Sequence, residues 1–210
     1  IDVKKIRKLP ALIYISLIIA FLYLPILVMI LYSFNEGSAT GAFTGFTLKW
    51  YGSVFQNQSI IDALILTVSI AVISTIVSTI LGTVAAIGIN ATSKGWQSVV
   101  SNITYVPMLN PDIVTGISMM LLFVLSGISR GYATMLIAHI TFSLPYVIFS
   151  VLPKLKQLES NTFEAALDLG AKPAYAIRKI VVPQIMPGIV TGALLAFTMS
   201  IDDFVISLFV

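Results

Sequence analysis

Three carboxylates, those of Asp112, Asp202 and Asp203, lie within or at the edge of long apolar stretches. An acidic side chain in the middle of a membrane span costs about 2.5–3.5 kcal/mol on insertion scales, so it usually faces a cavity or a partner. In such a place the carboxylates would offer weak anionic contacts to a passing cation. On one helix, the side chains of the adjacent Asp202 and Asp203 would point about 100° apart, so at most one of them can face a substrate pathway. The alternative is that both lie in water at the outer end of a span.

Asp112 has two readings of its own. Asn110 can cap a helix, Pro111 can be its first residue, and Asp112 would then lie in the first turn, where the helix dipole favours an acid. A helix broken in mid-membrane is also how transporters expose polar groups to their substrates. Both readings stay open.

His139 is the one histidine of the chain and lies in an apolar stretch. A helix–helix hydrogen bond is the favoured role, because no second titratable group stands four residues before or after it to relay a proton.

Other kinds of chemistry have no signature in this sequence. There is no phosphate-binding loop of the form G-x-x-x-x-G-K-[ST], no Ser/His/Asp set, no cluster of metal ligands and no cysteine. The sequence therefore predicts a chain that is not itself an enzyme and holds no metal or cofactor. The net charge of +3 does not indicate nucleic acid, because the basic residues sort by membrane side.

The elements that must position these residues are membrane helices. The chain is 58% hydrophobic and 10% charged, which leaves too little polar surface for a water-facing exterior. Crossing a bilayer takes about 20 apolar residues as a helix. The sequence predicts an all-α, polytopic transmembrane bundle as one domain over 1–210, with five spans: 10–33, 60–89, 99–125, 133–152 and 184–205. We expect a kink at Pro25, and breaks in the third span at Pro107 and at Asn110-Pro111-Asp112.

The distribution of lysine and arginine predicts the orientation. With the N-terminus inside, ten basic residues fall on the inner side and only Lys49 and Arg130 on the outer side. Such an excess marks cytoplasmic loops. The ten are Lys4, Lys5, Arg7, Lys8, Lys94, Lys154, Lys156, Lys172, Arg178 and Lys179.

The cytoplasmic loop 153–183 predicts a helical hairpin. Asn161 and Glu164 have capping-box spacing, a helix over 162–169 follows, and Gly170 is placed to end it in the left-handed conformation. Pro173 fits the first turn of a second short helix over 174–181. Phe163 and Leu167 are four residues apart and would share an apolar edge suited to a groove, although a mere surface linker is an alternative.

The small-xxx-small patterns Gly82-x-x-x-Ala86 and Gly188-x-x-x-Gly192 predict close helix packing, which we expect with a second subunit.

The same loop resembles the coupling segment of the membrane subunits of ATP-binding-cassette (ABC) importers. That family's motif is E-A-A, three residues, G, nine residues, then I-x-L-P. Here it reads Glu164-Ala165-Ala166, Gly170 and Ile180-Val181-Val182-Pro183, with Val182 in place of the usual leucine. The resemblance implies a type I importer permease fold with coupling helices that dock into a groove of a separate ATPase. The residues it implicates are Phe163, Glu164, Ala165, Ala166, Leu167, Gly170, Ile180 and Pro183.

Nearly the whole chain resembles the second permease subunit of spermidine/putrescine importers. The resemblance is carried by FTLKWY (46–51), NPDIV (110–114), HITFSLPYV (139–147), TFEAALDLGA (162–171) and FTMSIDDFVISLFV (197–210). It implies a bacterial inner-membrane protein with six spans, of which five are present, so we expect residues missing at both ends. It also implies a cytoplasmic ATPase dimer that binds ATP and Mg²⁺, a second and different permease chain, an external binding protein, and lipid contact. The expected substrate is a polyamine, met by Asp202, Asp203 and Asp112.

Other substrates remain open, because related permeases carry thiamine, ferric iron, sulfate, phosphonates or opines. An ion-coupled secondary transporter is a further alternative, although it would need internal repeats. A non-transporting scaffold protein would leave the loop motif unexplained.

Overall fold

A computed structural model describes residues 3–37, 42–158 and 160–210, apart from the side chains of 3–9, 11 and 160–162. The described residues are helical, with one isolated bridge between Asn35 and Phe46, which confirms the all-α class. Four helices among them are long and apolar enough to cross a membrane, or five if a bent pair is one span. The chain divides into two compact units, Ile1–Ala63 and Leu64–Val210. The single domain over 1–210 stays a prediction.

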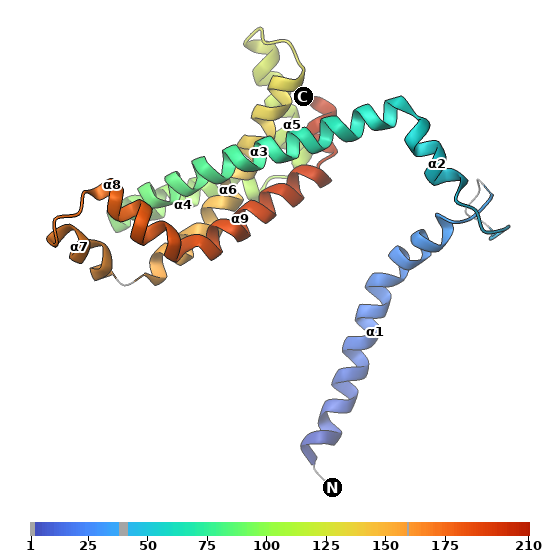
Figure 1. The fold of residues 1–210 in the computed structure, drawn as a ribbon, viewed down its shortest axis with the longest axis horizontal. Coiled ribbons are helices and arrows are strands. Elements are labelled where there is room, and N and C mark those ends of the chain that lie inside the picture. Colours follow the sequence, from blue (N-terminus) through green and yellow to red (C-terminus); the bar gives the residue numbers. More distant parts are fainter. Residues whose placement is uncertain (1–2, 38–41, 159) are drawn as a thin grey trace. The chain divides into compact units, whose positions relative to one another are not determined.

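The bounds of the helices follow the predicted spans closely, with extra breaks (Figure 1). They are α1 (Val3–Tyr32), α2 (Lys49–Gln56), α3 (Gln58–Asn90), α4 (Lys94–Leu109), α5 (Asp112–Leu125), α6 (Tyr132–Gln157), α7 (Ser160–Asp168), α8 (Pro173–Ala176), the π-helical turn η1 (Ile177–Val181), α9 (Val182–Asp202) and α10 (Val205–Phe209).

The first unit holds α1, α2 and the beginning of α3. Trp50 Nε1 donates to the carbonyl of Asn35 at 2.8 Å, and the Ser33 and Tyr51 hydroxyls are 2.8 Å apart. The rings of Phe34 and Phe46 stack with centroids 5.3 Å apart. Aromatic side chains therefore connect the residues that end α1 to Phe46 and to the first turn of α2.

The second unit is built around α6, against which α3 and α9 both pack closely. A Cβ on Gly82 of α3 would lie 2.7 Å from Val147 Cβ, and one on Gly192 of α9 would lie 3.1 Å from Val147 Cα. One on Gly188 would lie 2.8 Å from the Ser150 carbonyl oxygen. The expectation that these small residues pack against a second subunit is therefore wrong: they let three helices of the same chain approach each other.

A matched pair of glycines in α3 tests this packing. Gly82→Ala would force a methyl group into Val147, and overpacking of this kind costs about 1–3 kcal/mol. Gly88→Ala, six residues further along the same helix, meets nothing within 4 Å and should gain up to about 1 kcal/mol of helix stability. Thermal unfolding in detergent should therefore show the first variant melting below the parent chain and the second not. Equal midpoints would contradict the packing.

The predicted third span is two helices, α4 and α5, whose axes differ by 101°. The break lies at Asn110 and Pro111, both with extended ψ values of 139° and 141°, because a residue before proline is driven out of the helical region. The helix runs through Pro107 without ending, so the break expected there is not present. Asn110 ends α4 and does not cap α5, whose N-cap is Pro111, whereas Asp112 lies in the first turn as predicted. A single membrane crossing by this pair stays a prediction.

The predicted second helix of the loop is not a separate element. From Pro173 to Asp202 the chain is one continuous helical path, in which α8 passes through η1 into α9. The η1 turn is wide, with the Val182 N–H donating to the Ile177 carbonyl five residues back. Because proline lacks an N–H and crowds the preceding turn, a wide turn just before Pro183 lets the helix continue through it.

Candidate functional site

The turn after α7 has the predicted geometry. Gly170 has φ +85°, in the left-handed region that favours glycine. Its N–H donates to the Leu167 carbonyl at 2.8 Å, and the Ala171 N–H donates to the Ala166 carbonyl at 3.0 Å. These two bonds form a Schellman motif, which satisfies the last carbonyls of α7. The left-handed end at Gly170 is thus confirmed, and Pro173 begins α8 as expected.

The predicted outward apolar edge of Phe163 and Leu167 is not what this turn presents to the outside. Phe163 packs against the chain's own core cluster, which includes Val151 and Ile185, and Ala166 is buried. The outward apolar side chains are Leu169, 90% exposed, and Tyr175, 60% exposed. The remaining motif residues are outward or half-buried: Glu164, Ala165, Gly170 and Pro183 are exposed, and Leu167 and Ile180 are half-buried. The Asn161 cap lies outside the described side chains.

A hollow of about 500 Å³ lies behind α7. Its wall is formed by the last turns of α3 and α6, by α7, and by η1 with the start of α9. Most of the lining is apolar, with Lys156, Glu164, Asn90 and Gln184 as its polar members. The motif segment is therefore supported from behind by the ends of two long helices, and Glu164 belongs to both its exposed face and this hollow.

The three candidate carboxylates have different surroundings. Asp112 is exposed at the start of α5. Asp202, the last residue of α9, is exposed, and within the described ranges its carboxylate has no hydrogen-bond or ion-pair partner. Asp203 is different: its side chain is 5% exposed and its backbone is extended, with ψ 116°. The single helix predicted to carry both aspartates through residue 205 is therefore interrupted between α9 and α10.

The Asp203 carboxylate explains this interruption. It accepts hydrogen bonds from the backbone N–H groups of Ile206, at 3.2 Å, and Ser207, at 3.0 Å. It also accepts the Ser207 hydroxyl at 3.1 Å. A side chain that takes up the first free N–H groups of α10 competes with continuation of α9.

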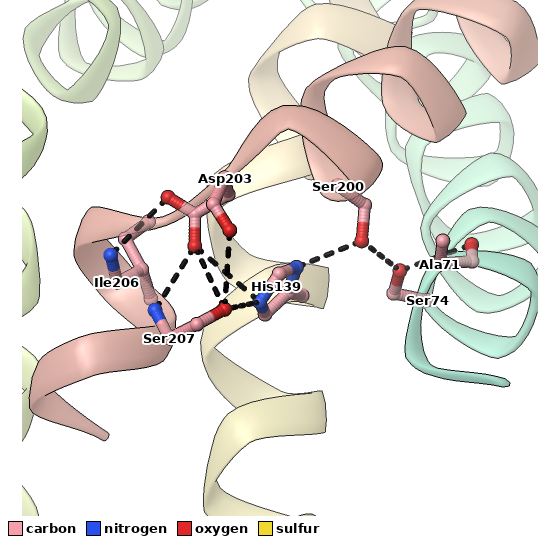
Figure 2. A network of polar contacts seen from close by, with 7 residues as sticks. All are labelled: Ala71, Ser74, His139, Ser200, Asp203, Ile206 and Ser207. Carbon is pink, nitrogen blue, oxygen red and sulfur yellow. Dashed lines mark hydrogen bonds and ion pairs between the residues drawn. The ribbon is translucent and has the colours of Figure 1, made fainter. Parts of the chain in front are cut away.

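Figure 2 shows that this carboxylate is one end of a buried polar network. His139 of α6 lies at its centre, with Nε2 3.5 Å from Asp203 Oδ2 and 3.1 Å from Ser207 Oγ. Its Nδ1 is 2.7 Å from Ser200 Oγ of α9, which is 3.1 Å from Ser74 Oγ of α3. Four helices, α3, α6, α9 and α10, thus meet through five side chains.

The role favoured for His139, a hydrogen bond between helices, is confirmed by its two serine partners. Sequence spacing did not reveal that a second titratable group, Asp203, stands beside it, because the two residues come from different helices. It also missed Ser74, Ser200 and Ser207. The available signal was weak: Ser200 and Ser207 lie within four residues of Asp203.

The described residues contain no group of three or more His, Cys, Asp or Glu side chains placed to hold a metal ion. The arrangement offers two functions of other kinds. The exposed Asp202 carboxylate, which has no partner among the described residues, can attract a cation. The turn at Gly170, closed by two backbone hydrogen bonds, presents the exposed side chains of Leu169 and Tyr175, which suits protein docking.

Comparison with known proteins matches residues 78–210 to the family of the binding-protein-dependent transport system inner membrane component. The chain is 38% identical over 197 residues to the spermidine/putrescine transport system permease protein PotC of Haemophilus influenzae, covering 94% of this chain and 77% of that protein. It is 39% identical over 197 residues to PotC of Escherichia coli, covering 94% and 75%. To the putrescine transport system permease protein PotI of Escherichia coli it is 37% identical over 201 residues, covering 90% and 70%.

Proposed function

The chain belongs to the family of inner membrane components of binding-protein-dependent transport systems, and from this premise we propose that it is a permease subunit of an ATP-driven importer of polyamines. Putrescine or spermidine would arrive from an external binding protein and cross between this chain and a second permease chain. The observation that carries the substrate is that three relatives at 37–39% identity are named for spermidine or putrescine transport.

Coupling to a cytoplasmic ATPase dimer is assigned to the segment 160–183. Support comes from the glycine turn and from the outward Leu169 and Tyr175, which the chain itself leaves exposed. ATP and Mg²⁺ would be bound by the ATPase, so this chain hydrolyses nothing itself. The positive-inside pattern supports a cytoplasmic position for this segment and for the N-terminus, in a bacterial inner membrane.

Asp202 is the carboxylate that we assign to the substrate pathway. It is exposed and without a partner among the described residues, whereas Asp203 already accepts three hydrogen bonds. An exposed carboxylate facing lipid would be costly, so a cavity or the second permease is its expected neighbour. Asp112 is a second pathway candidate, since it is exposed at the broken α4–α5 pair.

The test is ATP-dependent uptake of radiolabelled putrescine and spermidine into proteoliposomes that contain the full-length chain and its neighbouring gene products. Uptake that requires both ATP and the binding protein is the expected result. ATPase activity stimulated by a different binding protein, without polyamine uptake, would agree with the assignment as a permease and overturn the assignment of polyamines as substrate. Uptake driven by a proton or sodium gradient without ATP would overturn both.

The outward face of the loop gives a prediction about ATPase binding. Leu169→Ser removes an apolar side chain that the chain itself does not bury, so we expect normal stability but a loss of about tenfold or more in affinity for the ATPase. Phe163→Ser is the contrasting variant: it takes an apolar ring from the core cluster and should cost roughly 2 kcal/mol of stability. Co-purification and melting in detergent measure the two effects. ATPase binding that survives Leu169→Ser would exclude this face as the docking surface.

A further inference from the structure

Two members of the polar network of Figure 2, Ser200 and Asp203, flank Asp202 in the sequence. Ser200, two residues before it, contacts Ser74 of α3 and His139 of α6. Asp203, the residue after it, lies against the same histidine. We propose that His139 and Asp203 are positioning residues, which hold the break between α9 and α10 so that the Asp202 carboxylate is presented to the substrate. This inference rests on the proposed function.

One direction of donation links the four serine and histidine contacts to Asp203. With the proton of a neutral imidazole on Nε2, Ser74 Oγ donates to Ser200 Oγ, and Ser200 Oγ donates to His139 Nδ1. Nε2–H then donates to Ser207 Oγ, which donates to the Asp203 carboxylate. Ser200 and Ser207 each donate once and accept once, and the chain of donors ends on an anion, where hydrogen bonds are strongest. Ser74 only donates, and the Ala71 carbonyl, 3.3 Å from its Oγ, is a second acceptor for the same proton. The network therefore anchors Asp203 to helices whose positions are fixed by the glycine contacts on α6.

The same accounting separates the two adjacent aspartates. Asp203 accepts two backbone N–H groups and one hydroxyl, and it has His139 Nε2 at 3.5 Å. Its acceptor capacity is taken up within the chain, which leaves little for a passing cation. Asp202 keeps its full capacity, but its position depends on the neighbours on either side of it.

Without the network, the uninterrupted helix that the apolar run 197–210 favours by sequence becomes available. Closing the break would take the N–H groups of Ile206 and Ser207 from the carboxylate and return them to backbone carbonyls four residues back. Asp203 would leave its buried site, and the last turn of α9 would lose its contact with α6. Asp202 would then no longer be held at a fixed orientation.

The chain contains no cysteine, so a single Asp202→Cys variant reports the exposure of this position directly. In the assembled complex in proteoliposomes, the rate of its modification by a membrane-impermeant cationic thiosulfonate is measured. Two substitutions are combined with Asp202→Cys in separate chains. His139→Ala removes the imidazole, and Ser200→Ala is milder because it removes one hydroxyl of the network and keeps the imidazole. Thr198→Ala is the matched control, because its hydroxyl bonds only the Leu194 carbonyl of its own helix.

We expect both network variants to change the modification rate about tenfold, while the control behaves as the parent. Parental modification rates in both network variants would overturn the proposal. If the rates respond to His139→Ala but the complex with Asp202 intact takes up no putrescine, the positioning role stands and the substrate assignment falls.

Uptake by single and double variants is a second test of the positioning role. If His139 acts through Asp202, then His139→Ala should add no further loss of uptake to an Asp202→Asn chain, since the group it positions is already gone. A purely structural histidine would give losses that multiply. His139→Gln, whose amide can still donate toward Ser207 and Asp203, should restore most of the uptake lost in His139→Ala. Multiplying losses, or no rescue by glutamine, would overturn the positioning role.

Discussion

Gly170→Val is expected to lower ATP-driven uptake by about tenfold or more while membrane insertion stays normal. Gly170 has φ +85°, and a residue with a side chain held in this region costs about 1–3 kcal/mol, most for a β-branched one. A Cβ at this position meets nothing within 4 Å, so the penalty is one of backbone conformation and not of crowding. The turn would relax, the Schellman bonds would break, and the docking face would move relative to the ATPase.

Two controls separate conformation from bulk. Gly170→Asn should keep most of the uptake, because asparagine tolerates the left-handed region. Gly95→Val adds the same side chain at another open glycine, where φ is ordinary, and should leave uptake unchanged. Uptake by proteoliposomes and binding-protein-stimulated ATPase activity are the measurements. Wild-type uptake in Gly170→Val would contradict this account of the turn.

Asp202→Asn is expected to lower polyamine uptake by roughly tenfold to a hundredfold, with stability unchanged. A carboxylate attracts a cation 4 Å away by about 4 kcal/mol at an effective dielectric constant of 20, and the amide gives up that attraction. Because the Asp202 carboxylate has no partner among the described residues, its loss should leave no buried group unpaired. The variant should therefore melt like the parent chain.

Asp203→Asn provides the contrast, because the same change there removes a charge that accepts three hydrogen bonds. Loss of a buried acceptor costs about 1–3 kcal/mol, so this variant should melt at a lower temperature. Asp62→Asn, at an exposed carboxylate of α3, controls for the general effect of removing an acid. Uptake that is unchanged in Asp202→Asn would remove this residue from the pathway.

The sequence by itself determined the features that depend on local composition and local hydrogen bonds. Apolar stretches of membrane length become helices because the backbone must satisfy itself in lipid, and α1, α3 and α6 follow the predicted spans. Gly170 ends α7 as predicted, because a Schellman motif closes within six residues. The break at Asn110 and Pro111 is likewise local.

The tertiary structure decided which residues meet across the chain. His139 and Ser200 are 61 residues apart in sequence, and Ser74 and Ser200 are 126 apart, so no spacing rule brings them together. The same holds for Gly82 and Gly192, which contact α6 of their own chain instead of a second subunit. It also separated Asp202 from Asp203. The three hydrogen bonds to Asp203 come from residues three and four positions further on, but only the packing of the helices buries this carboxylate beside His139 of α6, at 3.5 Å, while Asp202 stays exposed.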